Sequence, residues 1–154
     1  MYCNFIPQHG FHFLLISHAY ITLYYIHAQE FKKAGNRPFP ISPAGLGIAT
    51  TSVFIDPAIS GAVNNRLELK ASIGLRFVGV GNIRVLVRIW RTGKEIYYGL
   101  ESNVFDNNII LNVETVDVAP LGVQNYQLII ENQTPATTTF VAGPLVFSAT
   151  AYSG

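Results

Sequence analysis

Cysteine is almost missing from this sequence, which has only Cys3 among its 154 residues. A single thiol can form neither a disulfide within the chain nor a thiolate zinc cluster. A chain of this length can nevertheless bury the core of one domain without such staples. Two interpretations of Cys3 stay open: an unpaired thiol near the N-terminus, and a crosslink to a second molecule.

Charge is scarce as well, because Asp, Glu, Lys and Arg make up 12% of the chain, about half of the roughly 25% usual for soluble domains. A surface with so little charge must be covered by uncharged polar residues or by other subunits. The formal net charge is +1, and the ten basic residues are spread along the chain. We predict no nucleic-acid partner, since proteins that bind nucleic acids concentrate Lys and Arg on one face.

Neither histidine nor cysteine occurs after His27, so later residues offer no imidazole base or thiol for hydrolase chemistry. Glutamates remain for a glycosidase-like carboxylate pair, but each lies beside polar or basic residues at a solvated position or a turn. No glycine pattern precedes a helix in the way that phosphate binding requires. The four histidines share no helical face, and no Asp or Glu precedes Glu30. We therefore predict no enzyme, no metal site and no cofactor.

Residues 1–36 form an N-terminal extension whose composition differs from the rest of the chain. Stretch 11–28 is strongly apolar, but no Lys or Arg precedes Lys32, so the positive segment of a signal peptide is missing. The stretch is also short for a transmembrane helix and is interrupted by polar residues, so we expect no integral membrane span. Three interpretations stay open: a β-rich connector that docks on a neighbouring subunit, an amphipathic or buried helix, and sequence upstream of the natural start.

Residues 37–46 are predicted to be a linker, because their three prolines keep the backbone extended and prevent a helix. Residues 47–154 are predicted to form one domain of short β-strands separated by turn residues. Thr92-Gly93 is predicted to be the tight turn of a hairpin. The predicted strands are 47–55, 66–73 with a continuation to 80 after a kink at Gly74, 83–91, 94–98, 109–116, 125–131 and 138–152, the last as one or two strands.

Two of these strands alternate between apolar and polar residues, which is the period of a strand with one solvated face. Their predicted inner residues are Leu67, Leu69, Ala71, Ile73, Ile83, Val85, Val87 and Ile89. About eight short strands without a convincing helix predict an all-β fold, an antiparallel β-sandwich that is jelly-roll-like and follows the apolar N-terminal extension. A parallel sheet is excluded, because no crossover helices are present.

The outward residues of strand 83–91 are the only grouping that suggests a binding site. Arg84, Arg88 and Trp90 share this face and can stack on a sugar or on the surface of a partner. In the competing interpretation, these long side chains simply cover apolar surface of the sheet.

One stretch matches the acceptor pattern for N-glycosylation, Asn132-Gln133-Thr134. Pro135 follows it directly, and the surrounding residues are those of a turn. We therefore interpret this stretch as an ordinary turn rather than as a modification site.

From residue 87 onward, three stretches carry a recognisable pattern: VRIWRTGKEIY, NYQLIIENQTP and VAGPLVFSATA. They resemble the C-terminal half of the exosporium protein C family of spore-forming bacteria, and the resemblance covers roughly residues 50–152. Family members have a similar arginine–aromatic–arginine hairpin, a strand ending in Glu-Asn-x-Thr-Pro, and a closing Gly-Pro-x-x-Phe-Ser strand. The matching positions are Arg88, Trp90, Arg91, Gly93, Tyr126, Glu131, Asn132, Thr134, Pro135, Gly143, Pro144, Phe147 and Ser148.

The resemblance implies a jelly-roll protein of the exosporium, the outermost layer of the bacterial spore. Related subunits build spore appendage fibres, in which an N-terminal extension links one subunit to the next. We therefore predict a structural, self-assembling protein without catalysis, as a homo-oligomer or filament that also contacts other spore-surface proteins. A carbohydrate-binding jelly-roll module, with Arg88 and Trp90 as the stacking platform, is the alternative.

Overall fold

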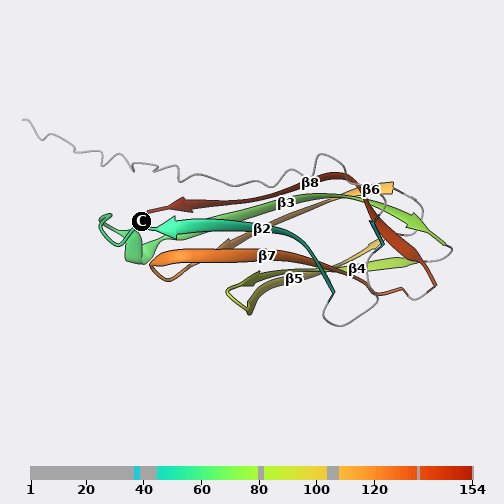
Figure 1. Cartoon of the computed structure of the whole chain (residues 1–154), viewed down its shortest axis with the longest axis horizontal. Helices are drawn as coiled ribbons and strands as arrows, with labels where there is room; N and C mark the ends of the chain where they lie inside the picture. Colours follow the sequence, from blue (N-terminus) through green and yellow to red (C-terminus); the bar gives the residue numbers. More distant parts are fainter. Residues whose placement is uncertain (1–36, 39–44, 80–81, 104–107, 135, 154) are drawn as a thin grey trace, which may run out of the picture.

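The computed structural model describes residues 37–38, 45–79, 82–103, 108–134 and 136–153. They form eight strands and one turn of 3-10 helix, η1 (Ala62–Asn64), and no α-helix occurs among them (Figure 1). The strands are β1 (Arg37–Pro38), β2 (Leu46–Ile55), β3 (Arg66–Val78), β4 (Ile83–Arg91), β5 (Lys94–Asn103), β6 (Asn108–Asp117), β7 (Gly122–Asn132) and β8 (Thr138–Tyr152).

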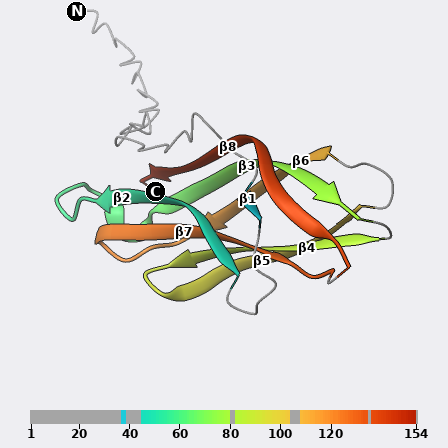
Figure 2. The same ribbon diagram turned by 45° about the vertical axis from the view of Figure 1, so that its right-hand side comes forward.

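The strands form two antiparallel sheets of four strands each. The first sheet has the order β1-β8-β3-β6, and the second has the order β2-β7-β4-β5. The pairs β1–β8, β2–β7, β3–β6 and β4–β5 are those of a long hairpin that is folded over and rolled up, which is the topology of a jelly roll. The two sheets pack as a sandwich (Figure 2), so the predicted fold class is confirmed.

Most strand boundaries lie where the sequence predicts them. β4 and β8 have the predicted bounds, β3 ends at Val78 instead of residue 80, and β2, β5, β6 and β7 extend the predicted ranges by a few residues. β3 is continuous through Gly74, and β8 is a single strand. Since turn residues and apolar alternation occur within short stretches of sequence, they locate strands without any knowledge of the sheet partners.

The first strand lies inside the range that we predicted to be a linker. Arg37 pairs with Val141, and Pro38 pairs with Phe140. A proline has no N–H for the ladder and is therefore tolerated in an edge strand, which is the position of β1 in the first sheet. Residues 1–36, the predicted N-terminal extension, lie outside the described residues.

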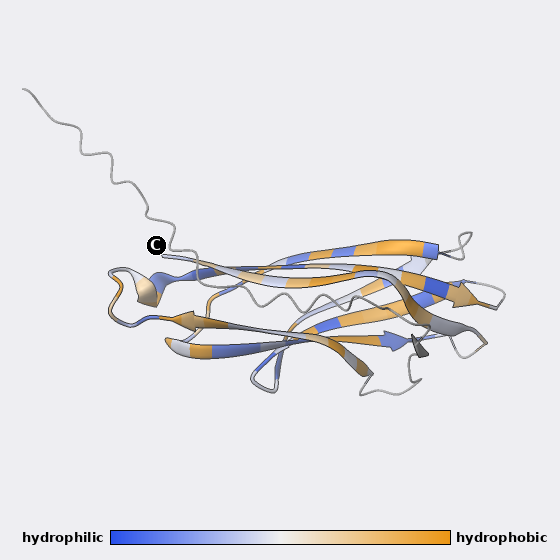
Figure 3. Ribbon diagram, turned by 45° about the horizontal axis from the view of Figure 1, so that its top comes forward, coloured by the Kyte–Doolittle hydropathy of each residue, from blue (hydrophilic) through white to orange (hydrophobic). Residues whose placement is uncertain are grey.

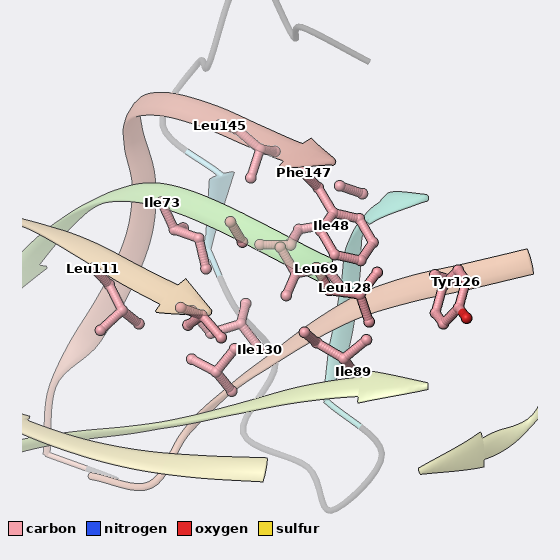
Figure 4. Packing of buried hydrophobic residues seen from close by; sticks show 14 of the residues in the cluster. Ile48, Leu69, Ile73, Ile89, Leu111, Tyr126, Leu128, Ile130, Leu145 and Phe147 are labelled. Atoms are coloured by element: carbon pink, nitrogen blue, oxygen red, sulfur yellow. The ribbon is translucent and has the colours of Figure 1, made fainter. Parts of the chain in front are cut away.

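The hydrophobic core fills the space between the two sheets. Apolar and polar residues alternate along the strands (Figure 3), and the apolar side chains point between the sheets (Figure 4). The eight predicted inner residues of β3 and β4 are all buried, with exposed fractions between 0% and 6%. Phe147 of β8 and Tyr126 of β7 are the largest side chains that are fully buried. The period-two prediction is therefore confirmed for both strands.

The ladder between β3 and β8 is irregular at the point where Gly74 of β3 and Gly143 of β8 approach each other closely. Ile73 pairs with Leu145 and Leu75 pairs with Val141, so three residues of β8 lie opposite Gly74. A Cβ at Gly74 would lie only 2.4 Å from the Cα of Gly143. Pro144 lies inside this bulge, where a missing N–H is tolerated, as the sequence predicts.

Buried asparagines hold the turns at the two ends of the sandwich. The Asn65 amide donates to the carbonyls of Ala62 and Ala119, at 2.8 and 2.7 Å, and its oxygen accepts from the Ala119 N–H. At the other end, the Asn132 amide donates to the Thr137 carbonyl at 2.8 Å, and its oxygen accepts from the Thr134 N–H. Asn132 is 2% exposed, which supports the turn interpretation of its glycosylation-like pattern.

Candidate functional site

The three residues singled out on strand 83–91 lie together on the outer face of the second sheet. Arg84, Arg88 and Trp90 alternate along β4 with the buried Val85, Val87 and Ile89, so they point away from the core. We call this surface the outer face. By register, the outer face also includes Leu86 of β4, Glu95, Tyr98, Leu100 and Ser102 of β5, Val123, Asn125, Gln127, Ile129 and Glu131 of β7, and Thr50, Ser52 and Phe54 of β2.

Arg88 is held by two carboxylates on neighbouring strands. Its Nε lies 3.4 Å from a Glu95 oxygen, and its Nη2 lies 3.6 Å from Glu131 Oε2. Glu131 is 7% exposed and accepts a hydrogen bond from the Gln133 amide as well. Because two carboxylates face one guanidinium, Arg88 offers no net positive charge to an anionic ligand. Arg84, which is exposed, forms no side-chain ion pair within the described part of the chain.

Several buried polar atoms of the outer face lack a hydrogen-bond partner within the described residues. They are Arg88 Nε, Trp90 Nε1 and Glu131 Oε2. Native proteins pair almost all of their buried polar atoms, and departures tend to occur where a site serves a purpose other than stability. The outer face therefore remains the best candidate for a functional surface among the described residues.

Tyr98 is a member of this surface that the sequence analysis missed. Its side chain is 70% exposed, whereas Trp90 is half-buried. A regular hairpin closed by Thr92-Gly93 would place Tyr97 opposite Arg88. A β-bulge between Ile89 and Trp90 shifts the register by one residue, so that Tyr98 pairs with Arg88 instead. No local pattern in the sequence announces this shift.

The outer face contains two open hollows, of which one is lined by Arg88 and the other by Trp90. The first has a volume of about 390 Å³ and is lined by Arg84, Leu86, Arg88, Glu95, Tyr98, Leu100 and Gln133. The second has a volume of about 430 Å³ and is lined by Thr50, Thr51, Ser52, Trp90, Thr92, Gly93, Asn125, Tyr126 and Gln127. The second hollow contains no ionisable acid or base other than the buried Tyr126, and its exposed polar groups are hydroxyls and amides.

A separate polar cluster joins the two sheets near the Thr92-Gly93 turn. Arg91 Nη1 lies 2.6 Å from Asp117 Oδ2, and the Tyr126 hydroxyl donates to the same oxygen at 3.0 Å. Arg91 also donates to the Val118 carbonyl. Burial, followed by the charge of Asp117, raises the pKa of Tyr126 far above its ordinary value. The cluster is structural, because it ties β6 of the first sheet to β4 and β7 of the second.

The raised pKa of Tyr126 predicts a loss of stability in alkali. Above the ordinary tyrosine pKa of about 10, the unfolded chain loses a proton that the folded chain keeps. Through this group, the free energy of unfolding should therefore fall by up to about 1.4 kcal/mol per pH unit above pH ~10. Below pH ~10, the group adds no dependence of stability on pH. Urea unfolding from about pH 8 to about pH 11 measures this slope. Tyr126→Phe should reduce the slope.

The remaining site predictions concern Cys3, the absence of a metal site and the absence of a membrane span. Cys3 and the four histidines lie outside the described residues. Within the described ranges, no three His, Cys, Asp or Glu side chains gather in a way that could hold a metal ion. In the same ranges, no helix has the length and apolar character needed to cross a membrane.

Topology and surface together define a jelly-roll β-sandwich with an aromatic and arginine-containing outer face. The chain matches no protein-family model and no curated protein. Several residues of the three stretches singled out in the sequence have structural roles in this fold. Asn132 and Thr134 shape a turn, Gly143 allows the close approach of β3 and β8, and Phe147 fills the core.

Proposed function

We propose that this protein is a structural, self-assembling protein of the bacterial spore surface, without catalysis. Subunits associate through strand edges into a homo-oligomer or filament. The resemblance to the exosporium protein C family and the low charge support the proposal. The observation that carries self-assembly is an open strand edge on one side of the sandwich, where β2 and β8 contain no charged residue.

The open edge belongs mainly to β8. Its partner on that side, β1, pairs only with Phe140 and Val141. From Leu145 to Tyr152, β8 has no further strand partner on this side among the described residues. β2 packs beside β8 at the edge of the second sheet. Neither β2 nor β8 contains an Asp, Glu, Lys or Arg.

The opposite side of the sandwich is different, because its edges carry charge. β5 contains Lys94, Glu95 and Glu101, and β6 contains Glu114 and Asp117. Charged residues on an edge strand oppose pairing with another chain, since pairing removes them from water. An added strand is therefore favoured on the β2–β8 side, where the backbone N–H and C=O groups of a second copy can extend a sheet.

In the proposed assembly, residues 1–36 act as the connector between subunits. Cys3, near the start of this segment, forms a crosslink that locks the contact. Repetition of one contact between different surfaces on successive subunits gives an open filament when the rotation between subunits does not close into a ring. Carbohydrates or other spore-surface proteins bind to such a layer without being needed for its formation.

The β8 edge is tested by two matched substitutions on the outer side of the first sheet. Val146 in β8 is 42% exposed, and Val116 in β6 is 47% exposed. Val146→Lys should weaken self-association about tenfold or more, the effect of roughly 1.4 kcal/mol at the contact. Val116→Lys should leave self-association unchanged. Size-exclusion chromatography and negative-stain microscopy of the full chain measure assembly, and circular dichroism verifies that both variants fold.

Two results would count against this proposal. A parent chain that runs as a strict monomer at every concentration would remove self-assembly altogether. Equal assembly by Val146→Lys and the parent would remove the β8 edge as the contact. Immunogold labelling of spores tests the location separately, and labelling confined to the spore interior would contradict it.

A further inference from the structure

We propose that the outer face of the second sheet binds an extended, neutral saccharide, with the exposed ring of Tyr98 as its stacking platform and the two hollows as successive subsites. This inference does not depend on self-assembly. It replaces Arg88 and Trp90, the platform expected from the sequence, with a residue that the fold brings to the surface.

The first subsite combines an exposed aromatic ring with planar polar groups. Tyr98 is 70% exposed, and Leu100 beside it in the same hollow is 46% exposed. The C–H groups of a sugar ring pack on such an aromatic and aliphatic surface, as apolar groups do elsewhere. Arg84, Glu95 and Gln133 border the hollow, and their planar side chains can bond to neighbouring hydroxyls in pairs.

The charges of this face select against an anionic ligand. Arg88 is compensated by Glu95 and Glu131, at 3.4 and 3.6 Å. Arg88 balances one of these two carboxylates, and the exposed Arg84 balances the other. The two arginines and two glutamates therefore have a net charge of zero. A phosphate or carboxylate ligand would meet no uncompensated cation beyond Arg84, and Glu95 would repel it. A neutral ligand rich in hydroxyls meets donors and acceptors of both kinds.

The second subsite is polar but has no formal charge at its surface. Thr50, Ser52, Asn125 and Gln127 present hydroxyls and amides from two adjacent strands. The Ser52 hydroxyl donates to the Asn125 oxygen at 2.7 Å, which orients the Asn125 NH₂ group for donation elsewhere. A protein–protein contact centre is richer in apolar and aromatic area than this surface. A polyol therefore fits it better than a second copy of the chain.

Arg88 and Trp90 lie between the subsites, since Arg88 lines the first hollow and Trp90 lines the second. Trp90 carries a buried N–H, at Nε1, without a hydrogen-bond partner among the described residues. A saccharide chain that passes from one hollow to the other brings hydroxyl oxygens to this position, where small side-chain movements give Nε1 an acceptor. Because one chain can occupy both hollows, a longer oligosaccharide should bind more tightly than a single sugar.

The test uses the full chain and linear hexasaccharides with β-glucose, N-acetylglucosamine or mannose units, measured by isothermal titration calorimetry. We expect at least one neutral hexasaccharide to bind, and its monosaccharide to bind at least about tenfold more weakly. Tyr98→Ala should weaken hexasaccharide binding about tenfold, and Tyr98→Phe should retain it. Gln127→Ala, in the second subsite, should weaken the hexasaccharide but not the monosaccharide.

Phe54→Ala is the matched control, because Phe54 is an exposed aromatic residue of the same sheet outside both hollows. Its binding should equal that of the parent. The proposal is overturned if no hexasaccharide binds, or if Tyr98→Ala binds as tightly as the parent. If Tyr98→Ala instead abolishes self-association and no saccharide binds, the outer face is an interface between copies. Preferred binding of an acidic oligosaccharide would overturn the neutral ligand class.

Discussion

Gly74→Ala is expected to lower the free energy of unfolding by about 3 kcal/mol, although it adds only one methyl group. That methyl carbon would lie 2.4 Å from the Cα and 2.8 Å from the carbonyl carbon of Gly143. Both are backbone atoms, so no side chain can turn aside to make room. β3 and β8 would have to separate at the bulge, and the ladder between them holds the first sheet together. Urea unfolding, followed by circular dichroism, measures the change.

Gly93→Ala is the control for Gly74→Ala, because it tests an unfavourable backbone conformation without a steric clash. Gly93 has a φ of +82°, but a Cβ there would meet no atom within 4 Å. Its substitution should therefore cost only about 1 kcal/mol, from the left-handed conformation. Gly143→Ala should cost more than this, because its Cβ would lie 2.9 Å from the Cα of Gly74. If Gly74→Ala is no more harmful than Gly93→Ala, the close crossing of β3 and β8 is not a real constraint.

Asp117→Ala is expected to cost about 3 kcal/mol, because it leaves two buried donors without their acceptor. Arg91 and Asp117 have side chains that are 16% and 13% exposed, and the Tyr126 hydroxyl shares the same carboxylate oxygen. The substitution removes the direct polar link between β6 of the first sheet and β4 and β7 of the second. Thermal and urea unfolding at neutral pH measure the loss.

A double variant distinguishes an unpaired cation from a general loss of packing. Arg91→Met with Asp117→Leu removes both charges and keeps the volume, so it should be clearly more stable than Asp117→Ala alone. If the double variant is as unstable as the single one, the unpaired charge of Arg91 is not the cause. In Asp117→Ala, the alkaline slope that Tyr126 causes should also diminish, since the neighbouring negative charge is gone.

The sequence predicted the fold class and most strands because both depend on local patterns. Alternation in β3 and β4 identified the inner residues, and the prolines and glycines marked the turns. It did not identify β1, since a strand of two residues with a proline has no pattern of its own. Only the free edge of β8 gives Arg37 and Pro38 a place to pair. The self-assembling function at the spore surface, in contrast, stays a proposal that rests on resemblance and on that edge.

The sequence likewise predicts only part of the candidate site, and tertiary structure determines the rest. The two-residue period of a strand is enough to place Arg84, Arg88 and Trp90 on one face of β4. The same period does not reveal what lies across from them, because cross-strand neighbours depend on register. The bulge beside Trp90 turns Tyr98 outward and Tyr97 inward, while Glu95, which pairs with Trp90 on the turn side of the bulge, lies 3.4 Å from Arg88 Nε. The sequence by itself thus determined which residues face outward on β4, while the pairing of strands decided that the arginine is neutralised and that a tyrosine carries the exposed ring.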